Sequence, residues 1–263
     1  MIEYINMESK SNFKKIALRA AKKAGKILEK NFRKATKIFF KKDSSLLTKV
    51  DLKSERAIVQ LIKKNFPSHD ILSEERGGKI GEKYTWIIDP LDGTRNYSRN
   101  IPFFSVSIAL VYKKSPILGV VFNPINKELY FSERGKGAFL NGKRIKVGQQ
   151  QVLSQAIISF SKSPDKEAFI KIYRILGKIK KFCFTFRFRY FGSTALDLCY
   201  IASAKTDVSI GTGLKPWDLA AGILIIREAG GKITNLEGRD CQIEEKNIIT
   251  ANVRLHNQLL KLI

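Results

Sequence analysis

The chain has 263 residues, and a content of 44% hydrophobic and 27% charged residues is typical of globular proteins and excludes a disordered or fibrous chain. Lysine and arginine number 48 against 24 acidic residues, and the formal net charge of +24 favours anionic partners such as nucleic acid, an anionic membrane or phosphorylated metabolites. Three widely spaced cysteines argue against a disulfide framework, and the sequence shows neither a signal peptide nor an uncharged apolar run of about 18 residues. These features predict a cytoplasmic protein that does not span a membrane. With only two histidines, a metal site would have to use carboxylates.

The first 150 residues predict two helices followed by a series of strands. Apolar residues recur at three- and four-residue spacing over residues 11–34 and again over residues 52–65, where Pro67 ends the second helix. A basic, polar connection lies between these two amphipathic helices. Alternating apolar residues and a hairpin turn at Asn141-Gly142 indicate a strand-rich section. Its predicted strands cover residues 71–73, 86–88, 104–110, 117–122, 129–131 and 144–146.

After about residue 150 the pattern changes to strands that alternate with helices. The predicted strands are residues 157–160 and 182–188, and the predicted helices are residues 165–179, 194–204, 217–229 and 254–263. We therefore predict an α/β fold in which helices are layered on sheets, with residues 1–150 in one lobe and residues 151–263 in the other.

The segment WIIDPLDGTRNY at residues 86–97 is the strongest candidate for a site. A buried strand leads to Asp89 and then to a Pro-initiated turn, and Asp92 follows three residues later, so both carboxylates can face one point and share cations about 3.5–4 Å apart. Gly93 and Thr94 would open the next turn, where backbone N–H groups can bind a phosphate. The alternative is an ordinary turn built from turn-forming residues.

Three further acids follow or precede apolar elements. Glu74 and Glu75 stand at the end of a predicted strand, where the alternative is a solvated loop. Asp218 stands at the start of an apolar helix, where the alternative is a helix cap. Oxygen ligands from several segments, without His or Cys, are the set that Mg²⁺ takes, with water and substrate phosphate oxygens as its other ligands.

Three strings carry a resemblance to a known family: SEE at residues 73–75, WIIDPLDGTRNY at residues 86–97, and WDLAAG with EAGG within residues 217–231. In this order they resemble the inositol monophosphatase family of Mg²⁺-dependent, lithium-sensitive sugar and polyol phosphatases. The resemblance covers nearly the whole chain. It implies a layered α-β-α-β-α sandwich of the inositol monophosphatase and fructose-1,6-bisphosphatase type, a single catalytic unit over residues 1–263, and a homodimer, which is common in the family.

The resemblance also implies a mechanism, position by position. Thr94 and Asp51, the latter in the string TKVD, match the pair that orients and deprotonates the attacking water. Glu75, also a candidate catalytic residue, is implied to lie beside the metal site. Gly93 and Thr94 match the phosphate-binding amides. The implied reaction is direct in-line attack by water activated by two to three Mg²⁺ ions, without a phosphoenzyme. The positions that match the family's metal ligands, with Asp89 bridging the two main ions, are Glu74, Asp89, the carbonyl of Leu91, Asp92 and Asp218.

The substrate side departs from the family pattern. In its inositol-specific members a Glu lies seven residues before the Asp of the WD motif, and this chain has Gly211 there, which predicts a more open pocket that accepts several polyol or sugar phosphates. Gly192, Ser193 and Thr194 keep the general form of the other substrate-side segment, which together with Asp92 would bind the substrate; a Ser or Thr helix cap is the alternative. The family's lysine before the TKVD string matches either Lys41 or Lys42.

The sequence also fits other functions. Fructose-1,6-bisphosphatase, histidinol-phosphate phosphatase and nucleotide 3′-phosphatase activities fit related scaffolds. A non-catalytic polyanion or nucleic-acid binder is the alternative of another class, because residues 10–53 carry a net charge of +12 and residues 161–191 a net charge of +7. The aromatic residues that alternate over residues 182–190 more naturally form the buried face of a strand, with Arg187 and Arg189 outside. The basic residues of the first helix should face solvent and support weak, nonspecific nucleic-acid binding: Lys14, Lys15, Arg19, Lys22, Lys23, Lys26, Lys30 and Arg33.

Overall fold

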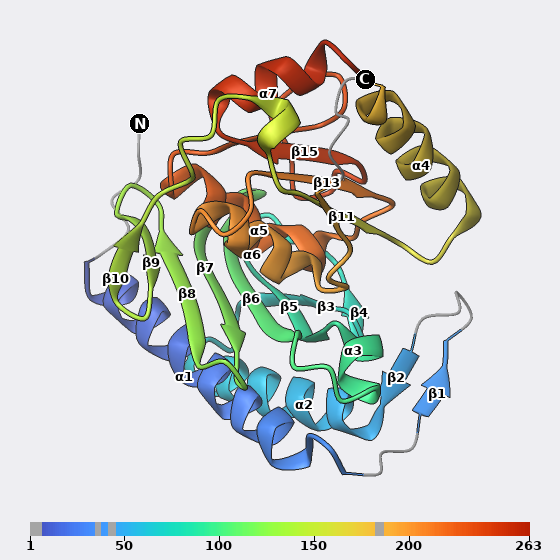
Figure 1. The fold of residues 1–263 in the computed structure, drawn as a ribbon. Helices are drawn as coiled ribbons and strands as arrows, with labels where there is room; N and C mark the ends of the chain where they lie inside the picture. Colours follow the sequence, from blue (N-terminus) through green and yellow to red (C-terminus); the bar gives the residue numbers. More distant parts are fainter. Residues whose placement is uncertain (1–6, 35–37, 42–45, 182–186) are drawn as a thin grey trace.

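The computed structural model describes residues 7–34, 38–41, 46–181 and 187–263, and these residues form alternating layers of helices and sheets (Figure 1). The helices are α1 (Met7–Asn31), α2 (Lys49–Asn65), α3 (Thr94–Ser98), α4 (Lys166–Lys180), α5 (Thr194–Ala202), α6 (Pro216–Glu228) and α7 (Val253–Leu260). In Figure 1, α1 and α2 cover the outer face of an eight-stranded sheet, α5 and α6 lie between it and a five-stranded sheet, and α4 and α7 lie beyond the second sheet. The predicted α-β-α-β-α sandwich is confirmed.

The eight-stranded sheet is apolar on both faces because it lies between two helical layers. Trp86 and Ile88 belong to the core cluster that includes α1 and α2, whereas Ile87 belongs to the cluster formed with α5 and α6. Successive side chains of a strand point to opposite faces, so a sheet covered on both sides selects an almost continuous apolar run. Its strands, in the spatial order β10-β9-β8-β7-β6-β5-β3-β4, are β3 (Asp70–Ser73), β4 (Gly77–Gly78), β5 (Tyr84–Asp92), β6 (Ser105–Tyr112), β7 (Ser115–Asn123), β8 (Glu128–Glu133), β9 (Gly137–Leu140) and β10 (Lys143–Ile145).

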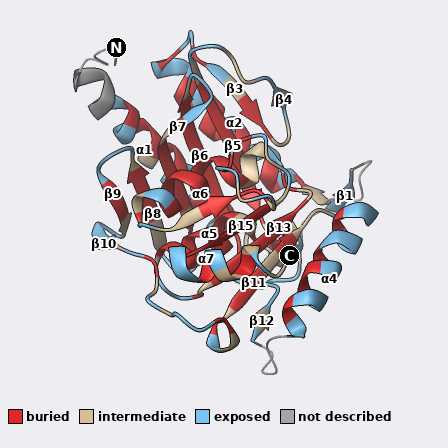
Figure 2. Ribbon diagram, turned by 90° about the horizontal axis from the view of Figure 1, so that it is seen from above, coloured by how far each residue is buried: buried red, intermediate tan, exposed pale blue. Residues whose placement is uncertain are grey.

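Helix α6 lies between the two sheets, in the middle layer of the molecule (Figure 1). Its residues 219–226 are all buried, as expected of a helix that is apolar all round and packs on both sides. Gly119 of β7 permits this close packing, because a Cβ at that position would lie 2.8 Å from the carbonyl oxygen of Ala221. Figure 2 shows α6 and the central strands buried, while α4 exposes its outer side. The five-stranded sheet has the spatial order β12-β11-β13-β15-β14, with β11 (Ile158–Lys162), β12 (Phe188–Arg189), β13 (Val208–Thr212), β14 (Lys232–Thr234) and β15 (Ile248–Ala251).

Several details differ from the sequence predictions. The basic connection after α1 contains a short antiparallel hairpin of β1 (Ile38–Phe40) and β2 (Leu46–Thr48), which are too short to show a period. Strands β13, β14 and β15 were not predicted. The buried aromatic face predicted over residues 182–190 is wrong at Tyr190, whose side chain is 54% exposed, and residues 182–186 lie outside the described residues. Strand β12 is therefore only a short edge strand within the described part of the chain.

The basic residues of α1 and its end are exposed, as predicted from their position off the apolar stripe. No helix among the described residues is long and apolar enough to cross a lipid bilayer. Cys199 and Cys241 are buried free thiols, and Cys183 lies outside the described residues.

Acid is expected to destabilise the protein through His69. This side chain is buried, stacks on Phe66 and Tyr84, and its Nδ1 accepts a hydrogen bond of 3.0 Å from the indole N–H of Trp86, so the ring must be neutral. Burial, reinforced by the charge of Lys63, lowers the pKa of His69 from 6.5 to about 4.

Because the unfolded state then binds the proton at a higher pH than the folded state, the stabilising contribution is complete above pH 6.5 and decreases as the pH falls towards 4. Urea unfolding should show that the wild type loses roughly 1 kcal/mol more than His69→Gln for each pH unit below about 6. Parallel stability curves for the two proteins between pH 6.5 and pH 4.5 would contradict this assignment of His69.

Candidate metal centre

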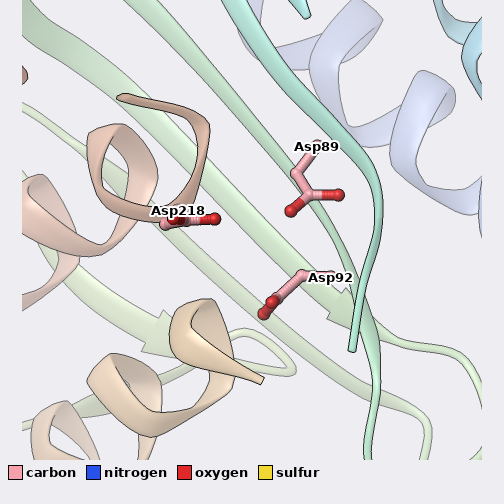
Figure 3. A group of neighbouring side chains, drawn as sticks. All are labelled: Asp89, Asp92 and Asp218. Carbon is pink, nitrogen blue, oxygen red and sulfur yellow. The ribbon is translucent and has the colours of Figure 1, made fainter. Parts of the chain in front are cut away.

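Three aspartates from two elements meet between β5 and α6. Each of Asp89, Asp92 and Asp218 offers a carboxylate oxygen, and these oxygens all lie within 4.8 Å of one another. In Figure 3, Asp218 extends from α6 towards the strand that carries Asp89 and Asp92. The register of β5 against β6 shifts between Asp89 and Asp92, and this irregularity allows the strand end to turn both side chains towards the helix.

Asp89 lies deepest in this group, with only 2% of its surface exposed. Its Oδ1 accepts a hydrogen bond of 3.0 Å from the backbone N–H of Leu91, which fixes the turn after the strand. Burial raises the pKa of Asp89 well above its ordinary value, and the charges of Glu74, Asp92 and Asp218 raise it further. Acids gathered in this way are unfavourable as anions unless a cation neutralises them.

Asp92 is held by the N-terminal end of α5. It accepts hydrogen bonds from the hydroxyl of Ser193 and from the backbone N–H groups of Thr194, at 3.2 Å, and Ala195, at 2.9 Å. Burial raises the pKa of Asp92 to about 6, although these hydrogen bonds lower it. Ser193 is the N-cap residue of α5, but its hydroxyl makes no capping hydrogen bond and donates to Asp92 instead.

Asp218 lies in the first turn of α6, where its Oδ2 accepts a hydrogen bond of 2.8 Å from the backbone N–H of Lys215. The N-cap residue of α6 is Lys215, so the alternative of Asp218 as the N-cap is wrong, although Asp218 accepts the N-cap N–H from its position in the first turn. The same carboxylate also joins the three-aspartate group. Burial and the charge of Asp92 raise the pKa of Asp218 well above its ordinary value.

Glu74 and Glu75 occupy the turn between β3 and β4. The N–H of Glu74 donates to the carbonyl of Ile88 at 3.1 Å, which attaches this turn to β5. The Nζ of Lys41 lies 2.8 Å from Oε1 of Glu74 and 2.6 Å from Oε1 of Glu75. Lys41 is therefore the lysine of this site within the described residues, and Lys42 lies outside them. Burial, with the charge of Glu74, raises the pKa of Glu75 to about 7 against the opposing effect of Lys41.

Thr94 and Asp51 are brought together although they are 43 positions apart in the sequence. The hydroxyl of Thr94 lies 3.3 Å from Oδ1 of Asp51 and 3.0 Å from the carbonyl oxygen of Leu91. The other oxygen of Asp51 accepts hydrogen bonds from the backbone and the hydroxyl of Thr48, in a capping box at the start of α2. Burial raises the pKa of Asp51 to about 6.

The two glycines singled out in the sequence have different surroundings. Gly93 precedes α3 with φ 91°, and a Cβ there would lie 3.1 Å from the carbonyl oxygen of Phe103, so this turn requires glycine. Gly211 lies buried within β13, where a Cβ would meet the side chain of Leu214 at 2.4 Å. Leu214 thus occupies the space beside Gly211, and the openness of the substrate pocket stays a prediction.

Sequence reasoning missed two buried polar residues of α2, Ser54 and Glu55, which contact the turns of the site. A signal for them was present, because they lie three and four positions after Asp51, where the apolar stripe of Ala57 and Ile58 would otherwise continue towards the start of the helix. Polar residues at positions of an apolar stripe indicate buried hydrogen-bond partners.

Comparisons with known proteins agree with this fold. Residues 9–263 match the inositol monophosphatase family. The chain is 40% identical to a protein of Haemophilus influenzae named Nus factor SuhB, over 93% of each chain, and 36% identical to inositol monophosphatase 3 of Solanum lycopersicum, over 96% and 97% of the two chains. The crystal structure of the extragenic suppressor protein SuhB from Bartonella henselae matches with a TM-score of 0.89 at 35% identity, over 95% of this chain and 98% of that one. The chain belongs to the inositol monophosphatase family, and this membership supports a phosphatase activity.

Proposed function

We propose that the protein is a Mg²⁺-dependent phosphomonoesterase that hydrolyses a phosphorylated polyol or sugar of the inositol-1-phosphate class. The observation that carries the proposal is the group of Asp89, Asp92 and Asp218, whose ligand oxygens converge within 4.8 Å next to the hydrogen-bonded pair of Thr94 and Asp51. The similarity to an inositol monophosphatase of Solanum lycopersicum supports this substrate class.

The residues present fit Mg²⁺. All donors are hard oxygens, and Asp89 and Asp218 have raised pKa values that a divalent cation would offset. Two to three ions would be held by Glu74, Asp89, the carbonyl of Leu91, Asp92 and Asp218. Mg²⁺ bound there would activate a water molecule and neutralise charge on the phosphate.

The chain's own residues then have separate tasks. The hydroxyl of Thr94 orients the attacking water, takes a proton from it and passes its own proton to Asp51. The backbone N–H groups of Gly93 and Thr94 bind phosphate oxygens at the start of α3. Glu75 forms an ion pair with Lys41 at the edge of the metal site, so the charges of the two residues offset each other. The hydroxyl of Ser193 and the backbone N–H of Thr194 orient Asp92, which would bind both the metal and the substrate.

The proposal is tested by phosphate release in the presence of Mg²⁺ from inositol-1-phosphate, fructose-1,6-bisphosphate, histidinol phosphate and 3′-phosphoadenosine 5′-phosphate, measured side by side. Among these four substrates we expect the highest kcat/KM for inositol-1-phosphate. A clear preference for one of the other three substrates would replace the substrate class and leave the phosphatase in place. No release from any substrate at any Mg²⁺ concentration would overturn the proposal.

A second proposed function is binding of nucleic acid by the basic surface of α1. Relatives 36% to 40% identical to this chain are named Nus factors, and the lysines of α1 are exposed in the structure. Exposed lysines on one face create a positive field that attracts polyanions and is screened over about 10 Å at 0.1 M salt.

Replacing Lys15, Lys22, Lys26 and Lys30 by Gln is expected to weaken both effects of this field. These four residues are exposed, whereas Lys14 lies over the ring of Phe131 and is better left in place. For the wild type, kcat/KM for a phosphate substrate should fall with ionic strength while kcat changes little, and single-stranded RNA should bind weakly and be released by salt. The variant should show a flatter salt dependence with an unchanged kcat. Sequence-selective RNA binding that resists salt would show instead that the surface is a specific second site.

A further inference from the structure

One side of helix α2 carries three polar side chains that contact the turns holding the acids of the site: Asp51, Ser54 and Glu55. Asp51 accepts a hydrogen bond from Thr94. One turn later, Ser54 contacts the turn after Asp89, and Glu55 contacts the turn of Glu74 and Glu75. The three side chains lie at positions i, i+3 and i+4, which face the same side of a helix. All three residues are buried.

Glu55 holds the turn of Glu74 and Glu75 from both ends. Its Oε1 accepts a hydrogen bond of 2.5 Å from the hydroxyl of Ser73 and one of 3.0 Å from the backbone N–H of Arg76. These donors immediately precede and follow the two glutamates. A single carboxylate oxygen therefore closes the turn and sets how far Glu74 extends from the end of β3.

Ser54 holds the other turn. Its hydroxyl donates a hydrogen bond of 2.8 Å to the carbonyl oxygen of Pro90, the residue between Asp89 and Leu91. Ser54 is fully buried, so breaking this bond would leave a carbonyl without its partner in the core. One helix thus binds the turn of Asp89 and Asp92 through Ser54 and the turn of Glu74 through Glu55.

We infer that Ser54 and Glu55 are positioning residues that fix the separation between Glu74 and the aspartates of β5, and thereby set the affinity of the metal centre. This inference rests on the proposed function, because it assigns Glu74 and the aspartates to one metal site. Residues that orient metal ligands typically change metal affinity by about 10- to 100-fold when they are replaced. Glu55 also lines an open surface pocket of about 500 Å³, together with Leu52, Val59 and Arg76.

The test measures binding of Mn²⁺ to the full chain by electron paramagnetic resonance, which needs no turnover. Glu55→Met keeps the volume of the side chain but offers no acceptor, and we expect its affinity for Mn²⁺ to fall about tenfold or more. Glu55→Gln retains an oxygen that can accept both hydrogen bonds and should stay within about threefold of the wild type. Gln60→Met is the matched control, because Gln60 lines the same pocket from an exposed position on α2. This control should bind Mn²⁺ as the wild type does.

Ser54→Ala gives an independent reading at the second turn, where loss of one hydrogen bond should weaken Mn²⁺ binding roughly fivefold. Circular dichroism and thermal unfolding would establish that the variants are folded. Wild-type affinity in folded Glu55→Met and Ser54→Ala, or equal losses in Glu55→Met and Gln60→Met, would overturn the inference while leaving the proposed function intact. A wild type that binds no Mn²⁺ would overturn the metal centre itself, and with it the proposed function.

Discussion

Replacing Asp89 by Asn is expected to reduce kcat by about 10³-fold or more while leaving the fold intact. Asp89 lies deepest in the three-aspartate group, so the amide would remove a buried charge needed to hold the metal ions. Phosphate release from the best substrate of the panel, at saturating Mg²⁺, measures the loss. The amide is close to the carboxylate in size, and the hydrogen bond from Leu91 can still be accepted by its oxygen.

Two controls separate the loss of charge from damage to the fold. Asp240→Asn changes an exposed aspartate in the same way and should keep the wild-type rate. In the absence of divalent cations, Asp89→Asn should be at least as resistant to heat as the wild type, because it relieves repulsion among buried acids. Addition of Mg²⁺ should raise the Tm of the wild type more than that of the variant. A kcat near the wild-type value would rule out Asp89 as a metal ligand.

The second large effect is expected at Thr94. Thr94→Val keeps the shape of the side chain but removes the hydroxyl that lies 3.3 Å from Asp51, and kcat should fall by about 10² to 10⁴ with little change in KM. Orientation of the water is needed chiefly in the transition state, so the loss appears in kcat and in kcat/KM to the same extent. Steady-state kinetics on one substrate at several Mg²⁺ concentrations measures the two constants.

Thr94→Ser is the matched variant, because it restores the hydroxyl and loses only a methyl group. It should recover most of the activity. If Thr94→Val instead raises KM with an unchanged kcat, Thr94 binds substrate and does not orient the water. If Thr94→Ser is as impaired as Thr94→Val, the methyl group and not the hydroxyl carries the role.

Local sequence patterns predicted which residues belong to the site better than they predicted the hydrogen bonds between distant parts of the chain. Asp89 and Asp92 could be assigned to one strand end because the apolar run and the turn residues around them are contiguous. The hydrogen bond from Ser193 to Asp92 joins residues 101 positions apart, and no periodicity within a helix or strand encodes such a contact. The hydrogen bond between Ser73 and Glu55, 18 positions apart, could not be predicted either. The sequence showed only that Glu55 is a polar residue in an apolar stripe.

The substrate side shows why an absent side chain is hard to interpret from sequence. Gly211 was expected to leave space, but space depends on the neighbours that fold against it. Leu214 follows only three positions later and its side chain packs where a Cβ would be. The short hairpin of β1 and β2 was missed for a related reason, because pairing between two three-residue strands depends on what lies between and beside them.

The position of α5 and α6 between the two sheets links metal binding to the free energy of separating the layers. Asp89 and Asp92 come from the first sheet, whereas Asp218 and the groups that hold Asp92 come from helices that also pack on the second sheet. A cation held by these acids is lost whenever the layers separate, so its binding free energy is linked to global opening and not to fraying of one element. Hydrogen exchange measured with and without Mg²⁺ should therefore show the slowest amides of β6 and β13 protected further by the same factor. Amides at the C-terminal end of α7 should exchange at an unchanged rate.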